Sequence, residues 1–598
     1  SIKLKSSHMS NRILTKIEDP FLFDLDYLEI YSLIADFDKI KNSKIKYERS
    51  IKISISSDYT SNYLTEFLPL FFANKRMNVE IHEKEFGSLN FLSRDITNKF
   101  WKNNTDLYLL IPSYKNLNFP KITDKFSLIK KKAQKDAIRW ISIWKKINKK
   151  IIQTTFDPPP YSNLGDVDGV RLGGHLHYIR LVNSFLIEKK PPNVHLIDIE
   201  NLIFKNKKTK WNDRKIYDLT KQPFSMETIP ILSNQIANAS KGMFGLAKKV
   251  LVTDLDNTIW GGIIGDDGLE NIILGSDTVE GESYQHFQEY LKQLTKKGII
   301  LCVCSKNNEK ISKKVFSKNP NMILKIEDIT VFKSNFSDKA SNIKEISKIL
   351  NIGLGSFVFI DDSKFECDQV KKTLPDVMTI KLSEDASESI EILESASPFY
   401  FNNISKEDLS RVSNYKKITK INSKIENSKN LESFLKSLKS KVVLEKISKK
   451  NCERSSQLIA KTNQFKLNSK IFSSKELIQR NAFCINYKDI HQDYGNIGVV
   501  ICKIKEGKEL IIDNWVMSCR VFSRRIEFFI IEYLLNEALK NQCRYLSFRF
   551  MKSEKNFYLQ DFLISLGLNI QNQNQSLKIN KNFIKKRIYK YYIKAKVF

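Results

Sequence analysis

The chain has 598 residues, which predicts about three or four domains and excludes a single small binding module. Hydrophobic residues make up 41% and charged residues 28%, and Gly (20) and Pro (14) are sparse, so a globular chain is expected rather than a disordered or collagenous one. Lys and Arg outnumber Asp and Glu by 98 to 67, a formal net charge of +31. These basic residues are spread over every segment, which argues against nucleic acid as a partner and leaves an acidic protein as the better match.

The chain is expected to work in the cytoplasm. Its longest apolar runs, such as 67–73 and 299–303, are far shorter than the roughly 20 residues that cross a bilayer, so no membrane segment is predicted. The extreme N-terminus lacks the apolar core of a signal peptide, and residues 6–9 resemble a tag remnant that ends in a native Met9. The eight cysteines form no CxxC pair, which favours neither disulfides nor zinc and fits a reducing compartment.

Residues 9–245 are expected to form a first α/β domain. Strands are predicted at 51–55, 78–82, 106–112, 151–155 and 194–199, and a helix at 62–73, an alternation typical of a parallel sheet. The first strand ends in Ser57-Asp58-Tyr59, which resembles the nucleophile block of SGNH-type esterases. The usual Gly-Asp-Ser is absent and no late Asp-x-x-His follows, so the expectation is an SGNH-like domain that is not hydrolytic and serves as a lid or docking surface.

A second α/β domain is predicted for 246–385, with strands at 249–253, 299–303 and 357–360. The first of these strands runs into Asp254-Leu255-Asp256-Asn257-Thr258, a D-x-D-x-T motif. Carboxylates two residues apart on a strand face the same way, so one can attack phosphorus while the other carries a proton to or from the leaving oxygen. About 50 residues separate Asp254 from Ser305, too few for a large cap between them.

Three further signals follow the motif in chain order: Ser305 ends a strand, Lys339 opens a helix, and the pair Asp361-Asp362 closes another apolar strand. This four-part pattern resembles that of the haloacid dehalogenase superfamily and predicts a capless, Rossmann-like domain of that type. The resemblance implies that Asp254 is the nucleophile, that Asp256 is the general acid and base, and that Mg²⁺ is the cofactor. The implied phosphate ligands are Ser305, Lys306, Asn307 and Lys339, and the implied metal ligands are Asp254, Asp256, Asp361 and Asp362.

The last third of the chain predicts a helical connector at 386–439 and a further domain at 440–598 with a basic tail. From 442 onward the order is strand, helix, several strands able to pair antiparallel, helix, strand and helix. That order matches an acetyltransferase-like (GNAT) α+β domain. The predicted fold class is therefore a multidomain α/β chain.

Within the haloacid dehalogenase superfamily, several longer segments of the chain resemble the FkbH-like proteins of polyketide biosynthesis. The similar segments are 211–225, 254–262, 265–268, 304–307, 461–465 and 518–521, so the likeness spans about residues 50 to 570. For that family the implied reaction loads a D-glyceryl unit from 1,3-bisphosphoglycerate onto the phosphopantetheine thiol of an acyl carrier protein, with loss of phosphate. Such a reaction needs an acyltransferase-type domain for the thioester and the Asp254 site for phosphate removal.

A covalent acyl intermediate would need a cysteine thiolate, and Cys304 and Cys519 are the candidates. Alternation along a strand points the Cys304 thiol away from the Ser305 side and toward a helix layer. Cys519 is the first choice, because it precedes a strand-to-helix turn whose N–H groups can hold the phosphate of a pantetheine arm. We expect that phosphate to pair with Arg520, Arg524 and Arg525. His491 is expected either to activate the thiol or to lie exposed in a turn.

Three classes of function fit parts of this pattern. The preferred one is an enzyme that makes a glyceryl thioester on a carrier protein. An Mg-dependent small-molecule phosphatase without acyl transfer is the alternative, although it leaves the last domain unexplained. A binding protein with a vestigial site is the third, and the intact motif set from Asp254 to Asp361 argues against it.

Overall fold

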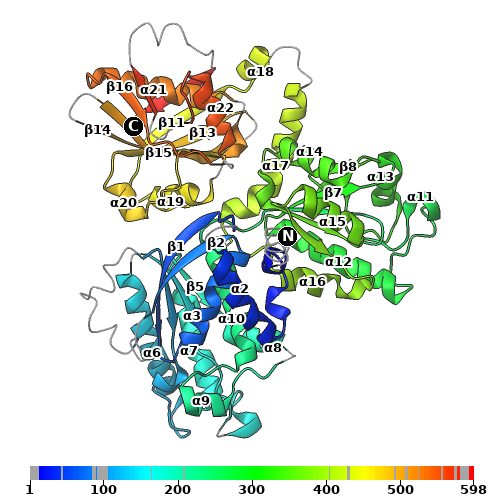
Figure 1. Ribbon diagram of the computed structural model, residues 1–598, viewed down its shortest axis with the longest axis vertical. Helices are drawn as coiled ribbons and strands as arrows, with labels where there is room; N and C mark the ends of the chain where they lie inside the picture. Colours follow the sequence, from blue (N-terminus) through cyan, green and yellow to red (C-terminus); the bar gives the residue numbers. More distant parts are fainter. Residues whose placement is uncertain are drawn as a thin grey trace, which may run out of the picture. The chain divides into compact units, whose positions relative to one another are not determined.

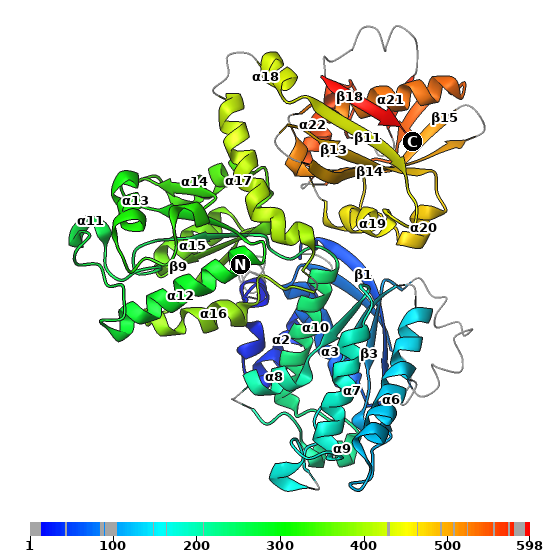
Figure 2. The ribbon, with the colours of Figure 1, turned by 180° about the vertical axis from the view of Figure 1, so that it is seen from behind.

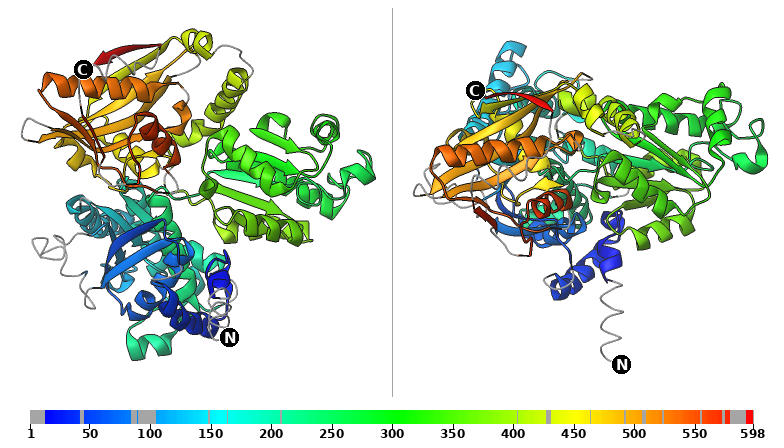
Figure 3. Two further views of the ribbon diagram at one scale, coloured as in Figure 1. Left: turned by 45° about the horizontal axis from the view of Figure 1, so that its top comes forward. Right: turned by 90° about the horizontal axis from the view of Figure 1, so that it is seen from above.

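The structure is a computed structural model, and Figures 1, 2 and 3 show it from four directions. The chain forms two compact units, of which the first ends at Met243 and takes in a short segment at Tyr400, while the second begins at Phe244. Among the described residues, no helix is both long and apolar enough to cross a membrane. The structure describes 13–597 except for 42–44, 84–88, 90–104, 148, 163, 207–208, 403, 427–430, 463, 491–492, 506–508, 523, 554–555, 572–574 and 579–591.

The first unit is built on a five-stranded parallel sheet in the order β2-β1-β3-β4-β5. Its strands are β1 (Arg49–Ser57), β2 (Met77–Glu83), β3 (Leu107–Ile111), β4 (Lys150–Thr154) and β5 (Val194–Ile197), which confirms the parallel α/β layer expected from the sequence. Successive strands are added on one side of β1 (β2) and then on its other side (β3, β4 and β5). Because crossovers between parallel strands are right-handed, this change of side places helices on both faces of the sheet. The helices α6 (Phe126–Lys146) and α7 (His175–Lys189) cover one face, and α3 (Asn62–Asn74) packs with α10 (Ile229–Met243) over the other (Figure 1).

The second unit begins with another five-stranded parallel sheet, in the order β10-β9-β6-β7-β8. Its strands are β6 (Val250–Thr253), β7 (Ile300–Ser305), β8 (Val331–Ser334), β9 (Phe357–Asp361) and β10 (Met378–Lys381). The helices between them are α12 (Val279–Lys296), α13 (Glu309–Lys318), α14 (Lys339–Leu350) and α15 (Lys364–Thr373). Only the four-residue helix α11 (Ile264–Asp267) interrupts the chain between β6 and α12, so this insertion carries no cap domain.

The segment expected as a connector is helical and contributes to this core. It forms α16 (Ser389–Ala396), α17 (Lys406–Glu426) and α18 (Leu431–Ser437). Tyr415 of α17 is buried in the same hydrophobic cluster as Ile343 and Ile346 of α14. The α17 helix is therefore part of the packing of the β6–β10 sheet rather than a free linker.

The remaining chain folds around a largely antiparallel sheet in the order β17-β16-β15-β14-β13-β11-β18, with β12 paired to β15. Among the described strands of this sheet, only the pairs β15 with β16 and β11 with β18 are parallel. The strands are β11 (Ser440–Lys446), β12 (Phe465–Lys466), β13 (Ala482–Lys488), β14 (Asp493–Lys505), β15 (Glu509–Met517), β16 (Tyr545–Phe548), β17 (Gln575–Lys578) and β18 (Ile593–Val597). The helices are α19 (Cys452–Lys461), α20 (Ser474–Ile478), α21 (Ile526–Lys540) and α22 (Phe557–Ser565). The predicted order of strand, helix, antiparallel strands, helix, strand and helix is present, and α20, β12, β17 and β18 are additions that the sequence pattern did not predict.

Candidate active site

Polar side chains gather where three neighbouring strands of the second sheet end. Ser305 is the last residue of β7, Asp361 is the last residue of β9, and Asp254 directly follows β6, which lies between them. The Asp254 amide donates a hydrogen bond to the Ile360 carbonyl oxygen (3.1 Å), which continues the pairing of β6 and β9 up to the motif. Carboxyl ends of parallel strands meet at one edge, so residues more than a hundred positions apart share one site.

Lys339 links two of the carboxylates from the first turn of α14. Its Nζ lies 2.9 Å from Asp254 Oδ2 and 2.5 Å from Asp361 Oδ2, and all three side chains are at most 10% exposed. Because a buried charge needs a partner, this ammonium group stabilises both acids where water cannot. One positive charge still faces two negative ones, so the site carries an excess of negative charge.

Asp254, Asp361 and Asp362 form a group that fits a divalent cation. One carboxylate oxygen from each lies within 4.8 Å of the others. The Asp254 Oδ1 atom is buried and accepts no hydrogen bond from the described residues. Burial and the neighbouring Asp254 raise the pKa of Asp361 to about 7 even though Lys339 opposes the shift, and the same two causes raise the pKa of Asp362. Clustered oxygen ligands of this kind suit Mg²⁺, which would relieve their mutual repulsion.

Asp256 is held apart from that group, which corrects the expectation that its carboxylate joins the metal ligands. Its Oδ1 accepts hydrogen bonds from Trp260 Nε1 (2.9 Å) and the Ile264 amide (3.2 Å), and its Oδ2 accepts one from Asn307 Nδ2 (2.8 Å). Burial raises the pKa of this carboxyl group. A carboxyl group that is fixed in this way beside Asp254 can act as a proton carrier.

The neighbours of Ser305 have positioning roles. Asn307 Nδ2 also donates to Ser305 Oγ (3.1 Å), so one amide aligns both the acid and the hydroxyl. Lys306, expected as a phosphate ligand, instead forms an ion pair with Glu366 (2.6 Å), and this pairing neutralises its charge. Lys339 is therefore the cation at the centre of the site.

Trp260 lies in the 254–262 segment, but sequence reasoning assigned it no role; in the structure its indole N–H contacts Asp256. Its indole ring is fully buried, and its N–H is aimed at the Asp256 carboxylate four residues earlier. The available signal was the spacing D-x-x-x-W, since a buried tryptophan needs an acceptor for its N–H. Asp256 is such an acceptor.

Replacing Trp260 with phenylalanine should lower the rate of phosphate-ester hydrolysis about tenfold, because it removes one hydrogen bond to the acid and keeps most of the buried ring. Initial rates with a chromogenic phosphate monoester measure this effect. Trp515→Phe is the matched control: Trp515 is also buried, but its N–H has no acceptor among the described residues. Equal rates for the two variants would show that the Trp260 N–H does not position Asp256.

Cys304 lies in the hydrophobic core under the site. It is fully buried among the residues of β6, β9 and α14, and its Sγ lies 3.7 Å from the Lys339 carbonyl oxygen. Burial raises the pKa of this thiol well above its usual range, which disfavours the reactive thiolate. The structure thus corrects the inclusion of Cys304 among the catalytic candidates and agrees with the side-chain alternation expected from the sequence.

The expected pantetheine turn is described only in part. Cys519 begins a short 3₁₀ helix (Cys519–Val521), but its side chain and all of His491 lie outside the described residues. Arg520 donates from Nε to Ser518 Oγ (3.1 Å), and Arg525 precedes α21 as its N-cap residue with a φ of 62°. These two arginines stay at the turn.

Arg524 does not line the turn, which corrects its expected role as a phosphate ligand. Its side chain is 1% exposed, and its guanidinium lies 3.6 Å from the buried Asp489 carboxylate. It also donates to the Phe522 carbonyl oxygen and to the Tyr494 hydroxyl, both at 3.2 Å. Breaking such a buried pair costs several kcal/mol, about 3–5, so Arg524 is a structural residue.

The first unit shows no exposed nucleophile at the end of β1. Ser57 is 2% exposed, and its Oγ accepts a hydrogen bond from the Tyr59 amide (2.9 Å). The Asp58 carboxylate accepts from the Ser113 amide (3.1 Å), and the Tyr59 hydroxyl donates to Asp157 (3.2 Å). The block resembling an SGNH nucleophile is thus tied into the carboxyl edge of its own sheet.

The fold and the carboxylate set of the second unit define a phosphatase domain of the haloacid dehalogenase type. Comparison with models of protein families and with curated protein sequences gave no match. A solved structure with marked similarity is the N-terminal part of the protein BF1531 from Bacteroides fragilis, described as containing a phosphatase domain complexed with Mg. The two chains share 28% identity at a TM-score of 0.57, over 62% of this chain and 99% of that one. Its bound metal agrees with the cofactor expected here.

Two acetyltransferase structures align more weakly. The ribosomal-protein-S18-alanine N-acetyltransferase from Escherichia coli aligns at 12% identity over 23% of this chain and 94% of its own. N-acetylglutamate synthase from Neisseria gonorrhoeae aligns at 10% identity over 92% of this chain and 99% of its own. Both TM-scores are 0.18, a value that does not establish a shared fold.

Proposed function

We propose that this chain is an Mg²⁺-dependent phosphatase and acyl transferase that uses 1,3-bisphosphoglycerate to load a glyceryl unit, as a thioester, on the phosphopantetheine thiol of an acyl carrier protein. The observation that carries the proposal is the assembled set of Asp254, Asp256, Lys339 and Asp361 in a chain that also holds a domain with the predicted acyltransferase order of elements. The first part supports phosphate removal, and the second part supports thioester formation.

The placement of the two motif acids supports removal of the C3 phosphate. Asp254 Oδ1, which has no hydrogen-bond donor among the described residues, attacks the phosphorus atom, and the bond from phosphorus to the C3 oxygen breaks. Asp256 donates a proton to that departing oxygen. It then takes a proton from the water that hydrolyses the aspartyl phosphate, so that both acids return to their starting state.

Other groups stabilise the charge that develops on the phosphoryl oxygens. Lys339 Nζ lies between Asp254 and Asp361, and Ser305 Oγ lies at the same sheet edge, so both donate to a phosphoryl group bound above Asp254. When bound by Asp254, Asp361 and Asp362, Mg²⁺ supplies Lewis-acid stabilisation of the same oxygens. Asn307 fixes the side chains of Ser305 and Asp256 relative to each other, because its amide donates to both.

Thioester formation at C1 is the second reaction. A thiolate attacks the C1 carbonyl carbon, the carbon–oxygen bond of the acyl phosphate breaks, and inorganic phosphate leaves with the electron pair. In the proposed route Cys519 accepts the acyl group first, and the pantetheine thiol then takes it with transfer of one proton to the released cysteine. Arg520 and Arg525 are placed at the turn where the arm's phosphate would lie.

Incubating a phosphopantetheinylated carrier with the protein, Mg²⁺ and 1,3-bisphosphoglycerate tests the proposal by intact-protein mass spectrometry. A glyceryl adduct on the carrier is expected, and omission of Mg²⁺ should leave a phosphoglyceryl adduct instead. Release of phosphate from small esters without any adduct would favour the alternative, a small-molecule phosphatase. If the protein neither releases phosphate nor forms an adduct, both the proposed function and the alternative are contradicted.

A further inference from the structure

The C-terminal sheet forks between β15 and β16. The two strands pair in parallel from Glu509 with Tyr545 to Ile512 with Phe548. Beyond this point β12 takes the place beside β15, and the Leu467 amide donates to the Trp515 carbonyl oxygen (3.0 Å). The chain that follows β16 joins the other side of this segment through the Met551 amide, which donates to the Leu467 carbonyl oxygen (2.9 Å). These hydrogen bonds satisfy backbone N–H and C=O groups that the separation of β15 and β16 would leave unpaired. A cavity lies beside the fork.

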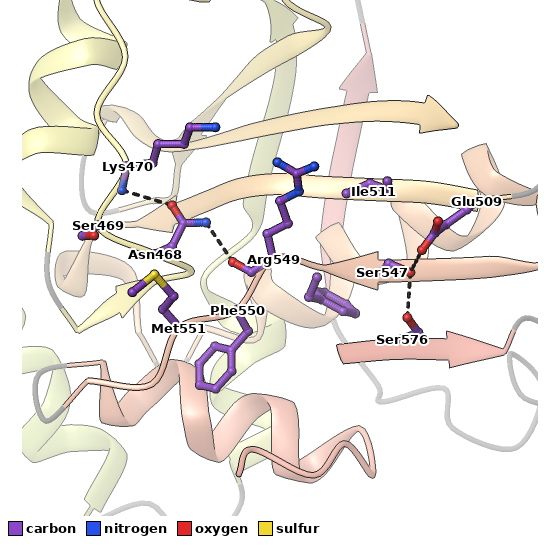
Figure 4. A pocket seen from close by; sticks show the side chains of 11 residues that line it. Asn468, Ser469, Lys470, Glu509, Ile511, Ser547, Arg549, Phe550, Met551 and Ser576 are labelled. Carbon is purple, nitrogen blue, oxygen red and sulfur yellow. Dashed lines mark hydrogen bonds between the residues drawn. The ribbon is translucent and has the colours of Figure 1, made fainter. Parts of the chain in front are cut away.

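This cavity has a volume of about 530 Å³, which suits a small ligand. Figure 4 shows its lining from close by. The lining comes from the loop after β12, from β15, from β16 with the residues that follow it, and from β17: Asn468, Ser469, Lys470, Glu509, Ile511, Ser547, Phe548, Arg549, Phe550, Met551 and Ser576. No residue of the phosphatase site takes part.

One end of the cavity carries excess positive charge. The buried Asp513 carboxylate faces Arg549 (2.8 Å), Arg480 (3.5 Å) and Lys470 (4.0 Å). One anion among three cations leaves two positive charges uncompensated at this end. Lys470 and Arg549 line the cavity with side chains 51% and 42% exposed, so they can reach a ligand there.

The main chains that carry these two cations are fixed by buried amides. Asn468 Nδ2 donates to the carbonyl oxygens of Asp513 and Arg549, both at 2.8 Å, and Asn468 Oδ1 accepts from the Lys470 amide (3.1 Å). Asn514 Nδ2 donates to the Lys470 carbonyl oxygen (3.1 Å). Figure 4 shows Asn468 between the two cationic residues. A ligand would therefore meet a preorganised pair, which lowers the entropic cost of binding.

The other end of the cavity offers hydroxyl groups and an acceptor. The Ser547 hydroxyl donates to Glu509 Oε1 and lies 2.8 Å from the Ser576 hydroxyl. Both serines and Glu509 line the cavity (Figure 4). A ligand hydroxyl group can enter this chain of hydrogen bonds either as a donor to Glu509 or as an acceptor from a serine.

We infer that this cavity binds a small phosphate monoester that also carries a free hydroxyl group. The dianionic phosphate pairs with Lys470 and Arg549, which together with Arg480 and Asp513 give this end of the cavity its excess of two positive charges, and the hydroxyl group bonds at Glu509, Ser547 and Ser576. The inference rests on the proposed function, in which the phosphoglyceryl donor has this chemistry. The phosphopantetheine arm is the competing occupant, because it also carries a hydroxyl group but holds its phosphate on the carrier as a singly charged diester, which the proposed route binds at the turn of Arg520 and Arg525.

A cysteine placed in the cavity reports binding locally. Met551→Cys puts a thiol on a lining side chain that is 48% exposed, whereas every native cysteine whose side chain is described is buried. The full-length variant is alkylated with N-ethylmaleimide in EDTA, which prevents turnover, and the modified peptide is quantified by mass spectrometry. We expect 3-phosphoglycerate or 4′-phosphopantetheine to slow alkylation severalfold, and glycerate and pantetheine to leave it unchanged.

Second variants test the contacts. Arg549→Gln, made in the Met551→Cys chain, should abolish the protection, and Arg544→Gln should keep it, because Arg544 is an exposed arginine of the same domain that does not line the cavity. Ser469→Cys, at another exposed lining residue, replaces Met551→Cys if that variant does not fold. The phosphorylated compound that protects more strongly identifies the donor or the carrier arm as the ligand.

Three results would overturn the inference: protection by neither phosphate ester, protection that survives Arg549→Gln, or protection by inorganic phosphate as strong as that by either ester. The reporter needs no catalysis, so the site and the proposed function can fail separately. Protection without any carrier loading would retain the cavity as a binding site and reject the acyl transfer.

Discussion

Asp254→Asn is expected to lower the rate of phosphate release by roughly 10⁴- to 10⁶-fold, the range seen when an enzyme loses its covalent nucleophile. An amide does not attack phosphorus, yet it has the shape of the carboxylate and leaves the fold intact. The Lys339 ammonium would keep its second partner, Asp361. Phosphate release from a small ester and from 1,3-bisphosphoglycerate measures the effect, and a phosphoglyceryl adduct should accumulate on the carrier.

Asp266→Asn is the matched control for this variant. Asp266 is an exposed carboxylate in α11, about a dozen positions along the chain, and it is outside the cluster of acids. Its replacement should leave the rate within twofold, about 0.4 kcal/mol. If the folded Asp254→Asn protein releases phosphate at a rate near that of Asp266→Asn, Asp254 is not the nucleophile.

Cys519→Ala is expected to block loading of the carrier, because the proposed route passes through a thioester on this residue. Trapping with 1,3-bisphosphoglycerate and no carrier should add a glyceryl or phosphoglyceryl mass to the Cys519 peptide of the unmodified chain. Hydrolysis of a small phosphate ester should survive the change, since the acids that perform it lie on a different sheet. Intact-protein mass spectrometry of the carrier measures loading.

Cys543→Ala provides the comparison, because Cys543 is a buried cysteine of the same domain beyond the end of α21. That variant should load the carrier normally. Full loading by Cys519→Ala would remove the covalent intermediate from the mechanism and favour direct attack of the pantetheine thiol on the acyl phosphate. Cys304 would not replace it, because its thiol is enclosed in the core.

The strand positions and the acids of the phosphatase site could be predicted because they depend on short patterns of neighbouring residues. Apolar runs that end in Asp254, Ser305 and Asp361 mark buried parallel strands, and parallel strands place their carboxyl ends at one edge. Lys339 was readable for a similar reason, since it opens a helix whose N-cap, Asp338, accepts from the Ser341 amide (2.8 Å).

Side-chain partners across the fold could not be predicted in the same way. Lys306 and Arg524 both read as free cations in phosphate-binding segments, and the structure pairs them with Glu366 and Asp489. Asp256 was predicted to be a metal ligand because of its place in the motif. In the structure its carboxylate instead accepts a hydrogen bond from the indole N–H of Trp260, four residues later. Each of these outcomes depends on which group the folded chain places next to the charged side chain.

The sequence by itself determined the multidomain α/β organisation, the parallel sheets, and the acids that stand at their ends, because strand periodicity and strand-end motifs are properties of neighbouring residues. Only the tertiary structure decided which carboxylates share a cation site, which thiol is enclosed, and which cations keep excess charge. Those properties follow from burial and from distances between segments such as Lys470 and Arg549, which lie far apart in the chain and meet at the fork of one sheet. Desolvation and pairing set the charge of a group, and both arise only when the elements pack.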